Sequence, residues 1–422
     1  MIFGIIGHGA AGTFAALRLR ETLEEMGRNA QQDRILLFEK ASQGLRKVKI
    51  SGGGRCNVTH HQFDSTLFCK NYPRGNRELR GPFHQFQAQD TVEWFHQRGV
   101  KLKVESDGRM FPETNSSQTI IDCFNKELQK NQIEVLHHKN ILTCEYNNPS
   151  FKVTLGKGET FSLDGLILAT GSDRSGYFLA KSLGHSISEL APSLFTFKIG
   201  HPLLKDLAGT SFEKVKIEVQ TEKRKWQEEG PLLITHWGLS GSAVLKLSAW
   251  AARELKTVHY KFPVFVNFLG LPRENIEKLL IDHIKQNPKK LVTTIPLPGL
   301  TKNFWQTFIG VLASDYPKLS EKMMNEVSKK EITYITDQLF HFKFTTTGHH
   351  RFKEEFVECG GITTKEINFK TMESRVCQGL FFAGEILDID GITGGFNFQN
   401  AWTTGFIAGE NMAKLCFNEE ES

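Results

Sequence analysis

Residues 2–12 read IFGIIGHGAAG, a short apolar run followed by a glycine-rich turn. A helical pattern then extends from Thr13 to about Met26, and a second apolar run, ILLF, leads to Glu39. The order strand, GxGxxG turn, helix, strand is that of a dinucleotide-binding unit of the Rossmann type. The first forty residues therefore predict an α/β fold that binds a nucleotide.

Each position of the turn has a physical task in such a unit. Gly7 permits the tight turn, Gly9 lets the main chain approach a pyrophosphate, and Gly12 allows close packing of helix on strand. The helix start at Ala10 and Ala11 offers free amides to phosphate oxygens. A turn that serves packing alone is the alternative interpretation.

Glu39 strengthens the prediction of a nucleotide. It ends the second strand, where a carboxylate can accept hydrogen bonds from both hydroxyls of a ribose. Its negative charge repels a 2′-phosphate, so we expect an adenosine that lacks this group.

Residues 47–57, KVKISGGGRCN, form a second glycine-rich segment, which we expect to be a loop. Its glycines allow main-chain amides to face a ligand at close range. Its cysteine suggests redox chemistry, but no partner thiol is near in the sequence, so a small packed residue is the favoured interpretation. The candidate ligand contacts here are Lys47, Gly53, Gly54, Arg55, Cys56 and Asn57.

Two further turns follow apolar strands, at residues 169–171 and 384–397. Asp388 could accept a hydrogen bond from a ribityl hydroxyl. The start of the last helix, near Phe396, would direct its positive end at the N1–C2=O edge of a flavin. The candidate contacts are Ala169, Thr170, Gly171, Gly384, Glu385, Asp388, Gly394, Gly395, Phe396 and Asn397. Together with the first turn, these motifs predict FAD as a bound cofactor.

The strand patterns at both chain ends indicate one fold made from two segments, 1–189 and 353–422. Alternating runs over 133–168 predict a small antiparallel meander within the first segment. Residues 190–352 form an inserted lobe, strand-like at first and then helical, with a small helical bundle near 270–332. The helical patterns in it cover 279–287, 302–313 and 318–330.

Composition narrows the class of protein. No run approaches the roughly 18 apolar residues that span a bilayer, and no signal peptide precedes the first strand, so we expect a cytoplasmic location and no membrane partner. Seven cysteines without a CxxC pair predict free thiols and no metal site.

Residues 190–350 carry 22 Lys and Arg against 15 Asp and Glu. This basic lobe could attract a nucleic acid, although lysines scattered on solvated helices are the more common explanation of such a charge.

Within the insert, THWGLSG at 235–241 contains the candidate catalytic residue, His236. Its imidazole could donate a proton near neutral pH, although a lone histidine is more often structural. His349 and His350 lie near the return to the first segment. They could line the same cleft or belong to a solvated turn.

Five motifs together resemble the HI0933-like flavoproteins, a family described as NAD(P)/FAD-dependent oxidoreductases or aminoacetone oxidase-like FAD-binding enzymes. These motifs are GHGAAG, KISGGGRCNVTH, GRMFPE, LITHWGLSG and GEILDIDGITGGFNFQNAW. The resemblance implies a Rossmann-like FAD domain built from both termini and an insert with a β-barrel-like part and a helical bundle. Carried over by position, it adds Lys40 to the residues expected around FAD.

Four positions depart from the family pattern: His8, Lys49, Ser242 and Asn400. None removes a phosphate or ribose contact. Ser242 and Asn400 do put the shape of the substrate side in doubt.

Motifs and resemblance together predict an FAD-dependent reductase. We expect NAD(P)H to dock transiently, because the chain has one dinucleotide fingerprint, and flavin N5 to pass hydride to an electron-poor double bond of a small molecule. The activities attributed to members of the family that the chain resembles include amine oxidation and the reduction of bile acids and of uridine in ribosomal RNA. A dihydrouridine synthase that acts on ribosomal RNA is therefore one alternative, and a non-catalytic flavin sensor is another.

Overall fold

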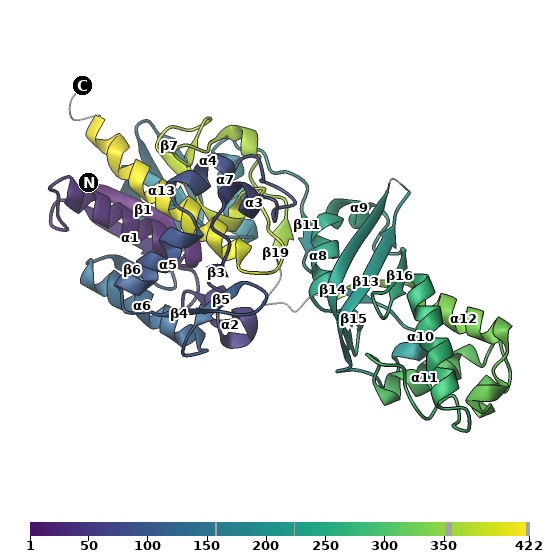
Figure 1. The fold of residues 1–422 in the computed structure, drawn as a ribbon. Coiled ribbons are helices and arrows are strands. Elements are labelled where there is room, and N and C mark those ends of the chain that lie inside the picture. The colour runs from purple at the N-terminus through teal and green to yellow at the C-terminus, as the bar shows by residue number, and fades with distance from the viewer. Residues whose placement is uncertain (157, 223, 351–356, 419–422) are drawn as a thin grey trace. The chain divides into compact units, whose positions relative to one another are not determined.

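The structure is a computed structural model that describes residues 1–156, 158–222, 224–350 and 357–418. The chain divides into two compact units (Figure 1). Unit 1 consists of Met1–Ala191 and Lys353–Ser422, and unit 2 of Pro192–Phe352. The return from unit 2 to unit 1 passes through 351–356, outside the described residues.

Five parallel strands form the centre of unit 1. In spatial order they are β6 (Glu134–Leu136), β2 (Arg34–Phe38), β1 (Ile2–Ile6), β10 (Gly165–Leu168) and β22 (Leu380–Phe382). Two short antiparallel strands, β21 (Glu373–Ser374) and β20 (Ile367–Asn368), extend the sheet. The central runs are continuously apolar because a parallel sheet is buried on both faces. β22 comes from the C-terminal segment and pairs with β10, so the predicted Rossmann-type α/β fold is confirmed.

Two helices from opposite ends of the chain lie side by side (Figure 1). They are α1 (Ala10–Glu25) and α13 (Phe396–Asn418). A Cβ on Gly405 would lie 2.6 Å from Ala11 O, and one on Gly409 would lie 2.3 Å from Ala15 O. Both positions of α13 therefore require glycine, because its main chain touches that of α1.

Smaller elements surround this core. The helices are α2 (Arg46–Gly54), α3 (Ser65–Cys69), α4 (Arg80–Gln85), α5 (Ala88–Gln97), α6 (Ser117–Lys130) and α7 (Arg174–Ser182). One three-stranded sheet has the order β3 (Thr59–His60), β5 (Arg109–Pro112), β4 (Leu102–Val104), and the other β7 (Ile141–Asn147), β8 (Ser150–Leu155), β9 (Thr160–Leu163). Strands β11 (Ala191–Ser193) and β19 (Val357–Cys359) form a separate two-stranded sheet.

Two local predictions in unit 1 are wrong in part. The segment from Lys47 begins as helix α2, with Val48 buried, and leaves helical geometry only at Ser51–Gly53. Residues 133–138 do not join the antiparallel meander, because β6 pairs in parallel with β2 at the edge of the main sheet. A three-residue strand is too short for its alternation to distinguish these two settings.

Unit 2 contains a seven-stranded antiparallel sheet. Its order is β17 (Phe342–Thr345), β16 (Pro263–Asn267), β13 (Ser211–Gln220), β14 (Lys225–Thr235), β15 (Gly238–Ser240), β12 (Thr196–Lys198), β18 (Gly348–His350). The helices are α8 (Ser242–Trp250), α9 (Ala252–Thr257), α10 (Arg273–Gln286), α11 (Lys302–Leu312) and α12 (Lys329–Phe340). One apolar core joins the inner face of the sheet to these helices.

The helix predicted at 318–330 begins later in the structure. Short 3-10 turns occupy Leu319–Glu321 and Met324–Glu326, and α12 starts at Lys329. The Ser328 hydroxyl accepts from Glu331 N, and the Glu331 carboxylate accepts from Ser328 N, forming a capping box. This pair of bonds sets the start of the helix.

Two general features apply to the described residues. Six cysteines are buried as free thiols: Cys56, Cys69, Cys123, Cys144, Cys359 and Cys377. Within the same residues, no helix combines the length and apolarity required to cross a bilayer.

The contact between α1 and α13 can be tested with Gly409→Ala. We expect the free energy of unfolding of unit 1 to fall by about 1–3 kcal/mol, because the added Cβ forces the helices apart. Urea denaturation followed by circular dichroism measures this. Gly310→Ala is the matched control, since a Cβ there meets nothing within 4 Å and should stabilise α11 by up to about 1 kcal/mol. Equal effects of the two substitutions would contradict the tight contact.

Candidate cofactor site at the strand ends of unit 1

The predicted segments meet at one edge of the main sheet, where the parallel strands end. Gly7 N donates to Phe38 O over 2.9 Å. A Cβ on Gly7 would lie 2.4 Å from Ala169 O, and one on Gly384 would lie 2.7 Å from Ala11 Cβ. The turns after β1, β2, β10 and β22 therefore form one site.

The glycine turn is built for a ligand with negative charge. A Cβ on Gly12 would lie 2.0 Å from Gly7 O, so Gly12 serves packing, whereas a Cβ on Gly9 would meet nothing within 4 Å. No side chain caps the start of α1, and its first turn has no acidic residue. Its free amides, at Ala10 and Ala11 among others, can bind a pyrophosphate that approaches over Gly9.

Glu39 and two lysines line the same edge. The Glu39 carboxylate accepts from His8 N over 3.3 Å and from Ala41 N over 2.8 Å, and it retains lone pairs for ribose hydroxyls. Lys40 forms an ion pair with Asp173. Lys47 donates to Ser172 Oγ over 3.2 Å and pairs with Glu385. The predicted cations are thus held by acidic partners at the site.

Two hydroxyls at this edge, Thr170 Oγ1 and Tyr177 Oη, are buried and have no hydrogen-bond partner among the residues that the structure describes. Burial, and then the charges of Glu385 and Glu358, raise the pKa of Tyr177 above its usual value, so its hydroxyl remains a donor. A buried polar group without a partner is costly unless a ligand satisfies it. Thr170 was predicted from its turn, but Tyr177 and the buried Glu358 belong to no motif and were missed.

His8 is the main residue that sequence reasoning undervalued, since it appeared only as a departure from the family pattern. Its side chain is 4% exposed, and neither ring nitrogen has a hydrogen-bond partner among the described residues. Burial, and secondly the nearby His137, lower the pKa of His8 to about 4, so the ring is neutral at pH 7. A Cβ on Gly44 would lie 2.1 Å from Nδ1, so only glycine fits beside the ring. A neutral imidazole beside Glu39 offers one donor and one acceptor to a nucleotide.

The end of α2 presents main chain more than side chains. Gly53 and Gly54 have φ of 68° and 81°, are exposed, and face open space. Arg55 pairs with Glu105, and its guanidinium lies 4.0 Å from the centre of the Phe111 ring. Cys56 is fully buried, and burial raises the pKa of its thiol to about 12, so it is no nucleophile at neutral pH.

Asn57 and Asn397 fasten the glycine loop that leads into α13. The Asn57 amide donates to Thr59 O over 3.1 Å and accepts from Gly395 N over 2.9 Å. Asn397 donates to Gly391 O over 2.9 Å and accepts from Gly391 N over 2.8 Å. Both amides therefore hold the loop around Gly394 and Gly395.

The remaining C-terminal candidates divide between surface and core. Asp388 is half-buried at the edge of the site. Phe396 is 3% exposed and stacks on His60 at 4.8 Å, so it belongs to the core of unit 1. Asn400 is also buried, and its Oδ1 has no hydrogen-bond partner among the described residues.

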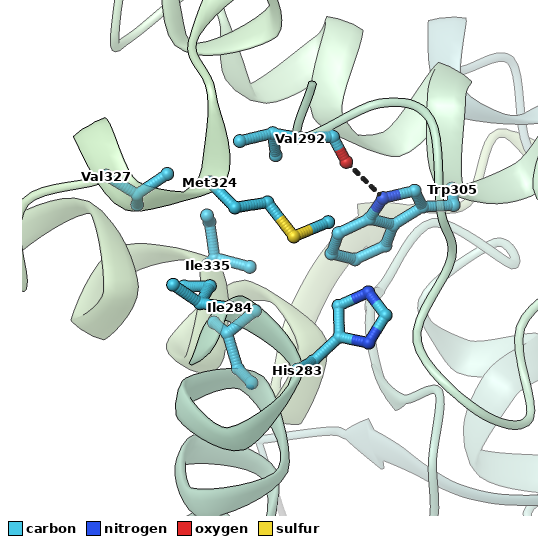
Figure 2. Close-up of a pocket in the computed structure, with 8 residues that line it drawn as sticks. His283, Ile284, Val292, Trp305, Met324, Val327 and Ile335 are labelled. Carbon is cyan, nitrogen blue, oxygen red and sulfur yellow. Dashed lines mark hydrogen bonds between the residues drawn. The ribbon is translucent and has the colours of Figure 1, made fainter. Parts of the chain in front are cut away.

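In unit 2, His236 is exposed in the turn between β14 and β15, and its catalytic role stays a prediction. Figure 2 shows a small pocket in the helical part of unit 2, where Trp305 Nε1 donates to Val292 O over 2.7 Å beside His283. Its volume of about 10 Å³ admits no organic cofactor. Across the described ranges, no cluster of three or more His, Cys, Asp or Glu could hold a metal ion.

The buried imidazole predicts a specific pH dependence in flavin-free protein. The pKa of His8 is about 4 in the folded state against 6.5 for an ordinary histidine. The unfolded chain therefore binds the proton more tightly, and the free energy of unfolding falls as pH drops from 6.5 towards 4, by up to about 3 kcal/mol from this group. Urea denaturation at pH 7 and pH 4.5 should show a smaller loss for His8→Leu than for the natural protein. The exposed His84→Leu is the control, and identical losses in all three proteins would exclude this role of burial.

Comparison with known proteins identifies the family of the chain. Residues 3–411 match the HI0933-like protein Rossmann domain. The 3-dehydro-bile acid delta(4,6)-reductase of Clostridium scindens is 27% identical over 97% of this chain and 98% of its own length. The ribosomal RNA dihydrouridine synthase of Escherichia coli is 27% identical over 97% of each chain.

Among solved structures, the 3-ketosteroid delta1-dehydrogenase from Sterolibacterium denitrificans is similar with a TM-score of 0.51. It is 10% identical, and the likeness covers 98% of this chain and 99% of that one, which shows a shared fold. The family match spans nearly the whole chain, and the glycine turn, Glu39 and the free amides of α1 lie together. The chain therefore belongs to the HI0933-like family and is a flavin-binding oxidoreductase.

Proposed function

We propose that the protein binds FAD at the strand ends of unit 1 and reduces a carbon–carbon double bond conjugated to a carbonyl, with NAD(P)H as electron donor. The observation that carries this proposal is the joint placement of open Gly9, the uncapped start of α1 and Glu39. Diphosphate and ribose are the two parts of FAD that such groups recognise.

The buried polar groups that lack a hydrogen-bond partner within the described ranges fit the same cofactor. FAD carries hydroxyls, ring nitrogens and phosphate oxygens along its length. The hydroxyls of Thr170 and Tyr177 and the two nitrogens of His8 supply donors and acceptors for them. Lys40 and Lys47 stand at the same edge, where their charge favours a diphosphate.

The names of two relatives support the proposed substrate class. One is named as a reductase of a bile acid, and the other as a synthase of dihydrouridine, which is uridine with a saturated C5–C6 bond. In both, the bond that is reduced is conjugated to a carbonyl. We therefore assign this reaction type to the present chain.

The bound flavin supplies the hydride-transfer chemistry at N5. The chain's own contribution begins with α13, whose first turn has no acidic residue and whose positive end favours negative charge on a nearby ring. Asn57 and Asn397 keep that helix start fixed by holding the preceding loop. The proton that completes the reduction comes from water or from a side chain, for which His236 is the candidate.

NAD(P)H docks transiently in this proposal, because the chain contains a single GxGxxG turn at a strand end. A ping-pong sequence follows, in which NAD(P)⁺ leaves before the substrate binds. A second candidate substrate is uracil in ribosomal RNA. It is favoured by the excess of Lys and Arg in residues 190–350 and by the dihydrouridine synthase relative.

Anaerobic stopped-flow spectroscopy tests the reaction. Mixing FAD-loaded protein with NADH or NADPH should bleach the visible absorbance of the oxidised flavin, because reduction to the hydroquinone removes it. Subsequent addition of a conjugated enone or of uridine-containing RNA should restore the absorbance. A flavin that neither nucleotide bleaches would refute the proposed donor, and a bleached flavin that only oxygen restores would refute the proposed substrate class.

The role of His8 can be measured without turnover. We expect His8→Leu to weaken the binding of both FAD and ADP by about tenfold, the cost of one lost hydrogen bond. Isothermal titration calorimetry on flavin-free protein measures both ligands, with His84→Leu as the control. An unchanged affinity for ADP would exclude a contact between His8 and the adenosine half.

A further inference from the structure

The unit 2 sheet has an inner face, which belongs to the apolar core, and an outer face. Val264, Val266 and Ile217 point inward into the core. Phe265, Trp237 and Leu233 stand outside that core, although all three are large and apolar. We define the outer face by the outward residues of β12–β18, among them Thr196, Lys198, Ser240, Phe265 and Lys343.

Two pairs of stacked rings lie on this outer face. Trp237 stacks on His350 with centroids 4.2 Å apart and an interplanar angle of 14°. Phe265 stacks on His341 at 4.2 Å and 2°. Trp237 is 46% exposed, which is high for an indole. The solvent face of an antiparallel sheet is normally polar, so exposed aromatic rings on it indicate a binding surface.

A lysine accompanies each ring pair. Lys343 lies directly opposite Phe265 in the pairing of β16 with β17. Lys198 lies two residues from Thr196, which pairs with His350, so Lys198 and His350 share a face. Both lysines are exposed.

The charge of the face as a whole is positive. Its exposed lysines are Lys198, Lys214, Lys216, Lys225 and Lys343. Glu229 pairs with Lys214 and Lys216, and Glu218 pairs with Lys225, while Glu213 lies in the bulge of β13. Within the described residues, lysines therefore outnumber the carboxylates that neutralise them.

The two ring pairs are far apart. Four strands, β13, β14, β15 and β12, lie between β16 and β18. At about 4.8 Å per strand, five strand spacings give a separation of about 24 Å. A mononucleotide cannot reach both ring pairs, whereas an extended strand of several nucleotides can.

We propose that this outer face binds single-stranded RNA, with bases stacked on Trp237 and on the Phe265–His341 pair and phosphates bound by Lys198 and Lys343. Every base has a π-face, so ring platforms with flanking cations hold single strands with little dependence on sequence. The inference rests on the proposed function in one respect, because the bound RNA is taken to be the strand that contains the uracil to be reduced. It assigns to unit 2 the task of holding the strand.

The test uses full-length, FAD-loaded protein and a fluorescently labelled oligouridine of about eight nucleotides, within the usual site size for such platforms. Anisotropy titrations across a salt series give the dissociation constant and its salt dependence. Trp237→Ala should weaken binding by at least fivefold, the loss of one base stack, and Trp237→Phe should retain most of the affinity. Lys198→Gln should lower the slope of log K against log salt by about 1.

Matched controls come from the helical part of unit 2. Leu291 is exposed to a similar degree, at 38%, and Lys302 is an exposed lysine on α11. Leu291→Ala and Lys302→Gln should leave RNA affinity unchanged. Uridine monophosphate should compete far more weakly than the oligonucleotide, because it can occupy one ring pair only.

The outcomes separate this inference from the proposed function. Absence of RNA binding by the natural protein, or equal binding by Trp237→Ala, overturns the RNA-binding face. If NAD(P)H still bleaches the flavin in that case, the proposed reductase with a small-molecule substrate stands. Loss of RNA affinity in Trp237→Ala with unchanged flavin bleaching supports the inference.

Discussion

The main-chain contact between α1 and α13 is the constraint on which the rest of unit 1 depends. Glycines at 405 and 409 let the last helix approach the first so closely that Gly384 comes within reach of Ala11. The pairing of β22 with β10 places the C-terminal turn beside the N-terminal one. Because each half supplies part of the site, neither segment can form it alone.

The site combines rigid main chain with side chains that are already paired. Amides at the start of α1 and positive-φ glycines at 53 and 54 present the backbone directly. Lys40 and Lys47 are bound to Asp173 and Glu385, so an arriving diphosphate joins or displaces an existing ion pair. Such pairing holds long side chains near their final positions and reduces the entropy that binding must overcome.

Local sequence patterns were sufficient to predict some residues of the site and insufficient to predict others. The GxGxxG turn and Glu39 could be predicted because their task depends on near neighbours in the chain. The importance of His8 could not, since it arises from Gly44 and from burial that only the folded chain creates. Tyr177 lacks a motif, and the burial of its hydroxyl, which has no partner in the described part of the chain, depends on packing around the turn after β10. Asn57 and Asn397 were predicted as ligand contacts, which stays a prediction, and the structure shows that their amides hold the glycine loop.

The buried cysteines have a consequence for a protein that handles electrons. A reduced flavin in air produces hydrogen peroxide, which attacks thiolates in preference to thiols. In the part of the chain described by the structure, six sulfhydryl groups lie beneath the surface, and burial raises the pKa of Cys56 to about 12 and that of Cys377 to about 11. The sulfur atoms of Cys56 and Cys377 therefore stay protonated and shielded, which protects them from the oxidant that a bound reduced flavin would release.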